Sequence, residues 1–377
     1  MTEPLNLHAY ERLARQRLPR MVYDYFAGGA GDEITLMENE LAWTRLRLRP
    51  RVLVDVSRCE ASTTILGRLV SMPVMLAPCA FNQLAHPDGE MAVARASTAE
   101  GVVQVLSTLS SYRLEEVASV DGGVRWFQLY CYRDREITRE IVRRAESAGY
   151  AALCLTLDVP RHGHRERDAR NRFKVPPGVR AANLEHRIAD SEDSSALLRY
   201  INEQFDPSLT WDAIDWLRGV SKLPIVVKGV LTGEDARRAV ERGVGGIVVS
   251  NHGGRQLDTA ITSCEALPEV ADAVAGRVEI YVDGGIRRGV DVLKAVALGA
   301  RAVLIGRPYL WGLAVGGETG VSRVLRLLRD DLLLSMALAG CPRVDGIDRG
   351  LVTSGGPGWL RCAERAGGSG AGDTDTV

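Results

Sequence analysis

The 377-residue sequence lacks most features that would tie it to a surface, a metal or a polyanion. Its formal net charge is −1, so bulk electrostatics give no reason to expect nucleic acid as a partner. The seven cysteines are scattered without a Cys-x-x-Cys spacing, which favours a reducing compartment and predicts neither disulfides nor a metal site. No run approaches the roughly 18 apolar residues that span a bilayer, and no apolar signal segment follows Met1. We therefore expect a cytoplasmic protein without membrane or nucleic-acid partners.

A Gly-x-Gly-x-x-Gly motif opening a helix after an early strand is also missing, which argues against a Rossmann dinucleotide site. Eight short apolar runs are present instead, each followed by a helical pattern. They cover residues 73–79, 102–107, 124–130, 151–158, 224–229, 246–251, 279–284 and 302–306. Near-continuous apolarity is typical of parallel strands that are covered on both faces. Eight such units predict an α/β fold of the (β/α)8 TIM-barrel class.

Segments outside this repeat define the expected organisation of the chain. Residues 1–72 carry helical patterns and are predicted to form an N-terminal helical cover over the barrel of residues 73–345. Residues 159–211 form a long loop after the fourth strand, which we expect to act as a lid. The small, polar residues 365–377 predict a disordered tail. No linker divides the chain, so residues 1–377 are expected to form a single domain.

Unusual polar residues stand at the ends of the apolar runs, where barrel enzymes carry their chemistry. They are Ser107, Gln128, Tyr130, Thr156, Asp158, Lys228, Ser250, His252, Asp283 and Arg307. Ionisable groups occur at five successive strand ends, and burying such groups without a purpose is costly. The pattern therefore predicts a functional pocket at this end of the barrel.

The last two strand ends predict a phosphate site. The segments DGGIRRG and IGRP combine glycines, which let backbone N–H groups approach an anion, with Arg287 and Arg307 as bidentate donors. Lys228 could face the edge of a bound flavin and stabilise negative charge on its ring. The alternative is a lysine that pairs with an acid on a neighbouring strand.

The stretch SNHGGRQLD at residues 250–258 follows the sixth run. His252 is a candidate base, and Asp158, two strands away, could orient its ring and stabilise its charged form. Arg255 offers a planar fork that matches a carboxylate. Together with a flavin, these groups suggest oxidation of an α-hydroxy carboxylate. The alternative is an ordinary loop histidine beside a solvated arginine.

With SNHGGRQLD, the segments LPRMVYDYFAGGA, AHPDGE, FQLY, LTLDVPR, VKGV, DGGIRRG and IGRP occur in order between about residues 10 and 341. In these motifs the sequence closely resembles the FMN-dependent α-hydroxy-acid oxidase and dehydrogenase family, which includes glycolate, lactate and mandelate oxidases. The resemblance implies a (β/α)8 barrel with FMN as cofactor. It also implies oxidation of an (S)-2-hydroxy acid to the 2-oxo acid, with O2 as acceptor and H2O2 as product, by a homotetramer or octamer.

The resemblance further implies roles for individual residues. The catalytic residues would be His252, Asp158, Tyr130 and Arg255. The substrate would contact Tyr25, Leu109, Tyr130, Arg165, His252 and Arg255. FMN would contact Pro78, Cys79, Ala80, Ser107, Gln128, Tyr130, Thr156, Lys228, Ser250, Asp283, Gly284, Gly285, Ile286, Arg287, Gly306 and Arg307.

Two departures from glycolate oxidases bear on the substrate. Those enzymes carry tryptophan where this chain has Leu109 and threonine where it has Cys79. The smaller, apolar Leu109 favours a medium-chain, lactate-like or aromatic (mandelate-like) 2-hydroxy acid over glycolate, and Cys79 is expected to form pocket wall. Open alternatives are a dehydrogenase that passes electrons to a quinone or a protein, oxidative decarboxylation in a closed site, and a non-catalytic barrel that binds a phosphate ligand.

Overall fold

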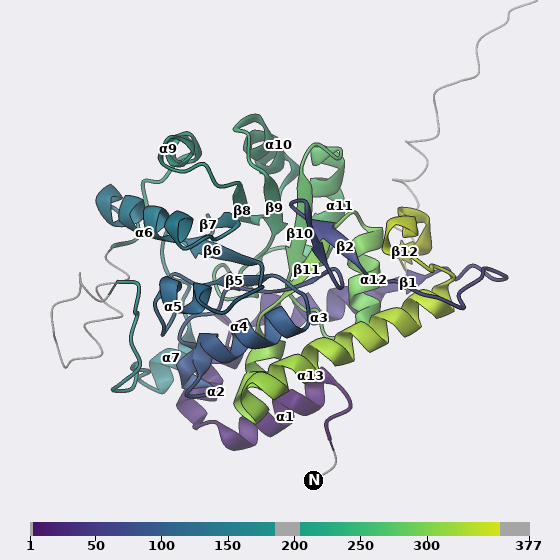
Figure 1. The fold of residues 1–377 in the computed structure, drawn as a ribbon, viewed down its shortest axis with the longest axis horizontal. Helices are drawn as coiled ribbons and strands as arrows, with labels where there is room; N and C mark the ends of the chain where they lie inside the picture. The colour runs from purple at the N-terminus through teal and green to yellow at the C-terminus, as the bar shows by residue number, and fades with distance from the viewer. Residues whose placement is uncertain (1–2, 185–203, 355–377) are drawn as a thin grey trace, which may run out of the picture.

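The computed structural model describes residues 3–184 and 204–354, which wrap a closed barrel in helices (Figure 1). The predicted tail at 365–377 and part of the predicted lid, residues 185–203, lie outside the described residues. The barrel strands, in chain order, are β4 (Val74–Leu76), β5 (Gln104–Leu106), β6 (Arg125–Leu129), β7 (Ala152–Thr156), β8 (Ile225–Val230), β9 (Gly246–Val249), β10 (Glu279–Asp283) and β11 (Ala302–Ile305). They pair in parallel in this order, and β11 closes on β4. The predicted (β/α)8 class is confirmed, with one strand in each apolar run.

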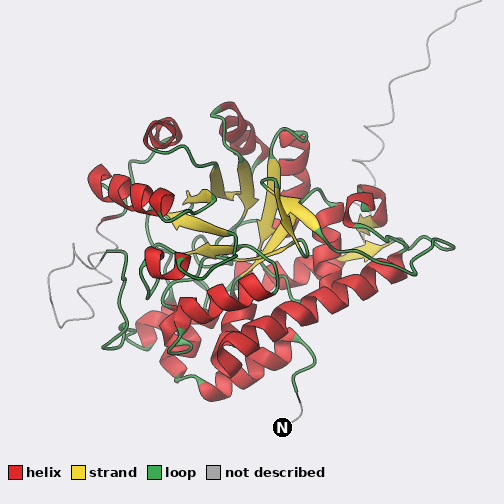
Figure 2. Ribbon diagram, in the orientation of Figure 1, coloured by secondary structure: helices red, strands yellow, loops and turns green. Residues whose placement is uncertain are grey.

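Each barrel strand leads into a helix on the outside of the barrel (Figure 2). The helices are α4 (Gly89–Ala99), α5 (Leu114–Ala118), α6 (Arg135–Ser147), α9 (Asp212–Val220), α10 (Gly233–Glu241), α11 (Ser263–Val274), α12 (Gly289–Ala297) and α13 (Arg307–Ala339). Asp134, Thr232 and Thr262 cap α6, α10 and α11, each accepting a backbone N–H with its side-chain oxygen. Shorter elements are the 3-10 helices at Asn82–Leu84, Val344–Gly346 and Arg349–Leu351, and the helix α7 (Glu166–Arg170) in the long loop.

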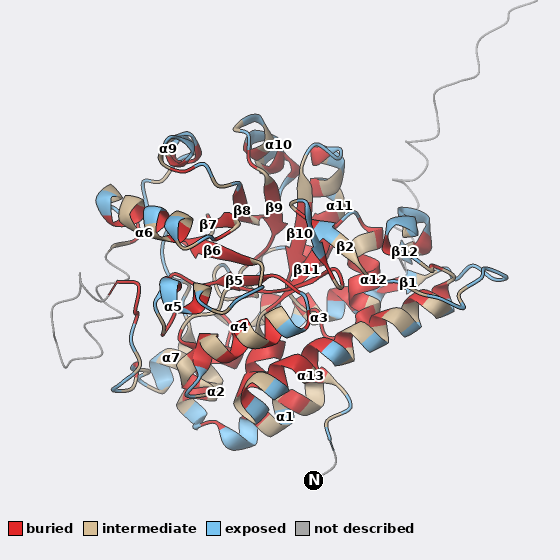
Figure 3. Ribbon diagram, in the orientation of Figure 1, coloured by how far each residue is buried: buried red, intermediate tan, exposed pale blue. Residues whose placement is uncertain are grey.

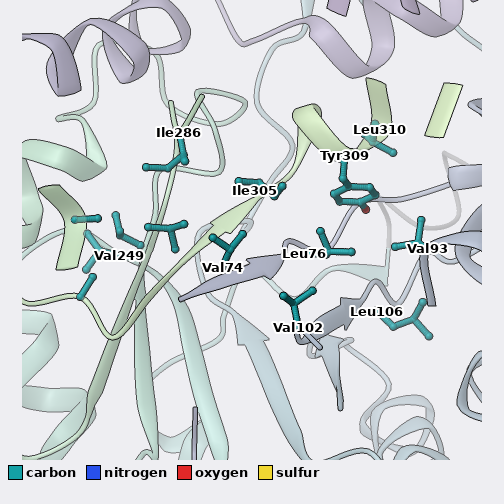
Figure 4. Packing of buried hydrophobic residues seen from close by; sticks show 14 of the residues in the cluster. Val74, Leu76, Val93, Val102, Leu106, Val249, Ile286, Ile305, Tyr309 and Leu310 are labelled. Carbon is teal, nitrogen blue, oxygen red and sulfur yellow. The ribbon is translucent and has the colours of Figure 1, made fainter. Parts of the chain in front are cut away.

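Two buried layers hold the barrel together (Figure 3). Inside the strands, Met75, Trp126 and Tyr281 belong to one apolar cluster, and the rings of Trp126 and Tyr281 meet edge to face at 5.3 Å. Between the strands and the helices lies the larger cluster, where Leu76 of β4 packs near Tyr309 of α13 (Figure 4). Because both faces of each strand are buried, the strands read as continuous apolar runs in the sequence.

The first part of the N-terminal segment is helical, as predicted. It contains α1 (Leu7–Arg17), α2 (Arg20–Ala27) and α3 (Ile34–Arg45). Leu18 is extended rather than helical because it precedes Pro19, so the predicted helical stretch divides there into two helices. Helices α1 and α2 pack against α13 at the lower side of Figure 1.

The second part of the segment is not the helical cover that the sequence suggested. Strand β1 (Leu46–Leu48) pairs with the C-terminal strand β12 (Val352–Ser354), and β2 (Thr63–Ile65) and β3 (Arg68–Val70) form a hairpin. Ile65 and Val70 join the cluster inside the barrel, and the Leu66 N–H donates to Glu279 at the start of β10 at 3.0 Å. The hairpin therefore plugs the N-terminal end of the barrel, opposite to the strand ends that carry the polar residues. Its two turn residues have positive φ, Leu66 at +44° and Gly67 at +74°; the glycine suits this conformation, but the leucine does not, so the pair gave only a weak turn signal.

We expect Ile65→Ala to lower the free energy of unfolding by about 2–5 kcal/mol, because it opens a cavity beneath the barrel interior. The matched control is Leu69→Ala in the same hairpin, whose side chain is 75% exposed and whose loss should change stability by less than about 0.5 kcal/mol. Urea unfolding measures both. Equal destabilisation by the two variants would show that the hairpin does not plug the barrel.

Candidate active site

One cavity opens at the C-terminal ends of the barrel strands. Of all the predicted site residues, only Asp158 and Ser250 do not line its wall. Both stand directly behind it, since Asp158 contacts His252 and Ser250 contacts Lys228. The structure thus brings together the residues that sequence reasoning selected from eight strand ends, from α2 and from the long loop.

His252 and Asp158 form a half-buried pair at one side of the cavity. Nδ1 of His252 lies 2.9 Å from Oδ1 of Asp158, which leaves Nε2 as the ring nitrogen for the cavity. His252 has φ +58°, a left-handed conformation that costs energy for a non-glycine residue, and its N–H is held by Ser250 Oγ at 3.0 Å. Burial and the nearby Lys228 lower the pKa of His252, so its imidazole is neutral. Burial opposes the charge of Asp158, but His252 and Lys228 outweigh it and hold the pKa of Asp158 below its usual value.

Gly229 makes room for this pair. It follows Lys228 on β8 with φ +107°, and a Cβ atom there would lie 2.7 Å from Cβ and Cγ of Asp158. Any side chain at this position would push Asp158 away from His252. The glycine of the VKGV segment is therefore required by the approach of the carboxylate.

Lys228 pairs with an acid, although this acid lies on β10, two strands from β8, and not on a neighbouring strand; its contact with a flavin stays a prediction. Its Nζ lies 3.2 Å from Oδ2 of Asp283 and donates to Ser250 Oγ at 2.8 Å, and the side chain also lines the cavity. Burial opposes its charge, but Asp283 and Asp158 raise the pKa of Lys228 above its ordinary value. Lys228 is therefore a fixed positive charge at the cavity wall.

The N-terminal cover and the long loop meet at the substrate side of the cavity. Nη1 of Arg255 donates to the backbone oxygens of Tyr25 and Gly28, both at 2.8 Å, and its guanidinium lies 5.4 Å from the centre of the Tyr25 ring. The Tyr25 ring stacks on Phe173 of the long loop at 4.3 Å and 5°. Arg165, just before α7, lines the same side, and burial together with Arg255 lowers the pKa of Arg165 to about 10. Two arginines thus lie on this side of the cavity, with the half-buried carboxylate of Asp168 close to both.

Arg287 lies at the other end of the cavity, in the predicted phosphate loop. Its Nη2 pairs with Glu40 at 2.6 Å, while its buried Nε has no hydrogen-bond partner among the described residues. Gly285 has φ +79°, and a Cβ there would lie 1.8 Å from the backbone oxygen of Asn39, so only glycine lets α3 pack on this loop.

Arg307 differs from the expectation of a free phosphate ligand. Its guanidinium donates to three backbone oxygens, those of Phe26 at 3.0 Å, Gly253 at 3.0 Å and Gly28 at 2.9 Å. Burial and the charge of Arg255 lower the pKa of Arg307 to about 9. Arg307 therefore ties the end of α2 to the SNHGGRQLD loop, and its contact with phosphate stays a prediction.

The donor set of the cavity fits FMN. In the described part of the chain, Nε of Arg287 and Oδ1 of Asp283 are buried without partners, as a phosphate and a polyol chain would require. Oε1 of Gln128 accepts the Thr108 N–H at 3.1 Å, and Nε2 of Gln128 donates to Thr156 Oγ1 at 3.1 Å. These bonds fix a polar wall that suits the edge of a ring. Leu109 and Cys79 add apolar surface to the same cavity.

Sequence reasoning missed His162 and Phe26, which also line the cavity. His162 lies in the long loop at a ring distance of 5.2 Å from Phe205, and Phe205 meets the ring of Tyr130 at 4.8 Å. Partial burial and the charge of Arg165 lower the pKa of His162. The charged sequence RHGHRERD gave no apolar or periodic signal, so its only selected residue was Arg165.

Among the helices of residues 3–184 and 204–354, none combines the length and the apolar character that a membrane span requires.

Comparison with known proteins agrees with this site. A sequence model described as FMN-dependent dehydrogenase matches residues 14–354. The chain is 53% identical over 356 residues to L-lactate oxidase of Nostoc sp. (strain PCC 7120 / SAG 25.82 / UTEX 2576), covering 92% of this chain and 98% of that protein. It is 50% identical over 350 residues to glycolate oxidase 3 of Arabidopsis thaliana, covering 92% and 95%.

Among solved structures, mandelate oxidase with (S)-4-hydroxymandelic acid is similar with a TM-score of 0.89 and 46% identity, covering 93% of this chain and 99% of that one. The fold, the site and these similarities together assign the chain to the FMN-dependent dehydrogenase family, and its cofactor is FMN.

Proposed function

We propose that the protein oxidises an (S)-2-hydroxy acid to the corresponding 2-oxo acid, with O2 as electron acceptor and H2O2 as the second product. The proposal rests on the 2.9 Å contact between Nδ1 of His252 and Oδ1 of Asp158, which leaves Nε2 of His252 free for the cavity that Arg255 and Arg165 also line. A base beside two carboxylate-binding groups matches a substrate that carries a hydroxyl and a carboxylate on adjacent carbons. The names of the relatives, which are lactate, glycolate and mandelate oxidases, support this chemistry.

In the proposed reaction, Arg255 and Arg165 bind the substrate carboxylate. Arg255 is already anchored by the backbone oxygens of Tyr25 and Gly28, so it is held in place before the substrate arrives. Tyr25 and Tyr130 line the same side of the cavity and direct the hydroxyl-bearing carbon towards His252.

His252 then accepts the proton that the substrate releases, at Nε2. Asp158 stabilises the resulting imidazolium through the bond to Nδ1 and keeps the ring in one orientation. When bound, FMN supplies the two-electron acceptor. We assign its phosphate to Gly285, Arg287, Gly306 and Arg307, and its ring to Pro78, Cys79, Ala80, Ser107, Gln128, Thr156 and Lys228, with Ser250 behind the wall as the hydrogen-bond partner of Lys228.

Electron acceptors other than O2 are the main alternative, because a dehydrogenase that uses a quinone or a protein would need the same base and the same arginines. The direct test mixes the FMN-loaded enzyme with (S)-lactate or (S)-mandelate without oxygen, and then admits O2. We expect the flavin absorbance to bleach and then to return with one H2O2 per substrate oxidised. Bleaching without return in O2 would favour the dehydrogenase, and no bleaching with any 2-hydroxy acid would favour a non-catalytic phosphate-binding barrel.

We also propose that the chain is one catalytic domain that assembles into a homotetramer or octamer in the cytoplasm. Several large apolar side chains are exposed in the single chain, including Leu53 at 104%, Val52 at 83% and Leu338 at 71%. Exposed apolar groups of this size are typical of surfaces that bury on association.

We expect His252→Gln to retain FMN but to slow substrate-dependent bleaching by about 10²–10⁴-fold, because the proton acceptor is lost while the contacts assigned to the phosphate remain. Stopped-flow absorbance without oxygen measures the rate, and the flavin-to-protein absorbance ratio checks that the cofactor is retained. A variant that bleaches at the wild-type rate would remove His252 from the proposed role.

Arg255→Lys should raise KM more than it lowers kcat, although the charge is conserved. One ammonium group cannot hold the oxygens of Tyr25 and Gly28 and also form a bidentate contact with a carboxylate. Arg165→Lys should have the same effect to a smaller extent, because its loop can adjust. Steady-state oxygen uptake provides both constants, and unchanged values for Arg255→Lys would mean that the carboxylate binds elsewhere.

Leu109 predicts the order of substrates. It is 7% exposed and lines the cavity, and its side chain is much smaller than an indole. A longer substrate side chain should gain roughly 0.8 kcal/mol, or about fourfold in kcat/KM, for each CH₂ that it buries. We expect medium-chain or aromatic acids to exceed glycolate, and Leu109→Trp to reverse or flatten this order. If glycolate is the best wild-type substrate, or if Leu109→Trp leaves the order unchanged, the size of the side chain at position 109 does not set the order of substrates.

A further inference from the structure

Glu90 is a buried acid that the proposed mechanism does not use. It is the last residue of the AHPDGE segment and lies in the first turn of α4, where it is 1% exposed. Its Oε1 accepts two backbone N–H groups, from Asn82 at 3.0 Å and from Ser111 at 2.9 Å. Asn82 belongs to the loop after β4 and Ser111 to the loop after β5. One carboxyl oxygen therefore ties together two loops that are separate in the sequence.

Both loops carry residues of the cavity wall. Cys79 stands three residues before Asn82, whose side-chain amide donates to the Cys79 backbone oxygen at 2.8 Å. Leu109 stands two residues before Ser111, and its backbone oxygen accepts the Phe81 N–H at 3.0 Å. The position of Cys79 and Leu109 relative to each other thus depends on these two bonds together with the two that Glu90 accepts.

The cluster also reaches the helix after the last strand. Tyr309, near the start of α13, lies close enough to Cys79 and Glu90 for their charges to affect its hydroxyl group. Figure 4 shows Tyr309 beside Leu76 at the end of β4. The start of α13 therefore lies beside the two loops that meet at Glu90.

The surroundings of Glu90 suit an uncharged carboxyl group. No cationic side chain of the described residues pairs with it, whereas Glu100, on the same helix, pairs with Arg326 at 2.8 Å and Arg329 at 3.5 Å. Within the described chain, Oε2 of Glu90 is buried without a hydrogen-bond partner. Burial raises the pKa of Glu90 against the opposing effect of the two backbone N–H groups.

We propose that Glu90 is a positioning residue whose uncharged carboxyl group clamps the loop of residues 77–83 to the loop of residues 107–112. The clamp fixes Cys79 and Leu109 as one apolar wall and so sets the size of substrate side chain that the cavity accepts. The part about substrate size rests on the proposed 2-hydroxy-acid oxidation, whereas the clamp itself does not.

The test compares Glu90→Gln, which keeps an acceptor for both N–H groups, with Glu90→Met, which keeps the shape but removes the acceptor. Glu100→Met is the matched control, because it removes a buried acid from the other end of α4 without touching either loop. Hydrogen exchange of the full FMN-loaded protein, followed by mass spectrometry of peptides covering 77–84 and 107–113, reports on the clamp independently of activity. Relative kcat/KM for glycolate, lactate, 2-hydroxyoctanoate and mandelate reports on the wall.

We expect Glu90→Met to speed exchange in both peptides by about tenfold or more, since two buried donors lose their acceptor. The same variant should flatten the order of substrates. Glu90→Gln should resemble the wild type in both measurements, and Glu100→Met should leave both peptides and the order unchanged. If Glu90→Met does not fold, Glu90→Asp takes its place, because the shorter side chain cannot reach both amides.

Unchanged exchange in the Glu90→Met or Glu90→Asp variant, or equal loosening by Glu100→Met, would overturn the clamp. If Glu90→Gln speeds exchange in both peptides as much as Glu90→Met does, the carboxyl group of Glu90 is not uncharged in the wild type. Loosened loops with an unchanged order of substrates would overturn the effect on specificity. A wild-type protein that oxidises none of these acids would instead contradict the proposed function, while the exchange result would still decide on the clamp.

Discussion

Positive charge, buried or half-buried, gathers around a single cavity and governs how the elements around it are arranged. Lys228, Arg165, Arg255, Arg287 and Arg307 all line the cavity, and removing such groups from water costs several kcal/mol each unless partners replace the water. Asp283 and Glu40 pair with Lys228 and Arg287, while Arg255 and Arg307 rely on backbone oxygens. Backbone oxygens carry no net charge, so they leave the charges of Arg255 and Arg307 to be balanced by other groups. In the proposed function, the FMN phosphate and the substrate carboxylate supply this negative charge.

The same constraint explains why the N-terminal helices belong to the site. The end of α2 supplies the oxygens of Tyr25, Phe26 and Gly28 to two arginines from distant loops. Tyr25 in turn stacks on Phe173, which brings the long loop onto the same corner. At the opposite end of the barrel the β2–β3 hairpin buries Ile65 and has no part in the chemistry. Stability and function are thus divided between the two ends, as is usual for this fold.

The sequence predicted what has a local signal. Strands buried on both faces read as apolar runs, and polar residues at their ends stand out, so the barrel and the polar part of the cavity wall could be found from local patterns. Tyr25, Leu109 and Arg165 were reached only through the family resemblance. Contacts between segments far apart in the sequence could not be found. The hairpin turn combines Gly67 with Leu66, which is not a usual turn residue, β1 and β12 are too short to show a period, and the oxygens that bind Arg307 come from a helix end. Glu90 could be noticed only as part of the AHPDGE motif, because its burial and the two hydrogen bonds that it accepts arise from tertiary structure.

Titration of the FMN-free protein with FMN and with riboflavin, which lacks the phosphate, shows whether the cations of the cavity require a phosphate, with flavin fluorescence as the signal. FMN should bind at least about a hundredfold more tightly than riboflavin, because charge-assisted hydrogen bonds contribute about 1.5–3 kcal/mol each. Equal affinities for FMN and riboflavin would mean that these cations do not hold a phosphate.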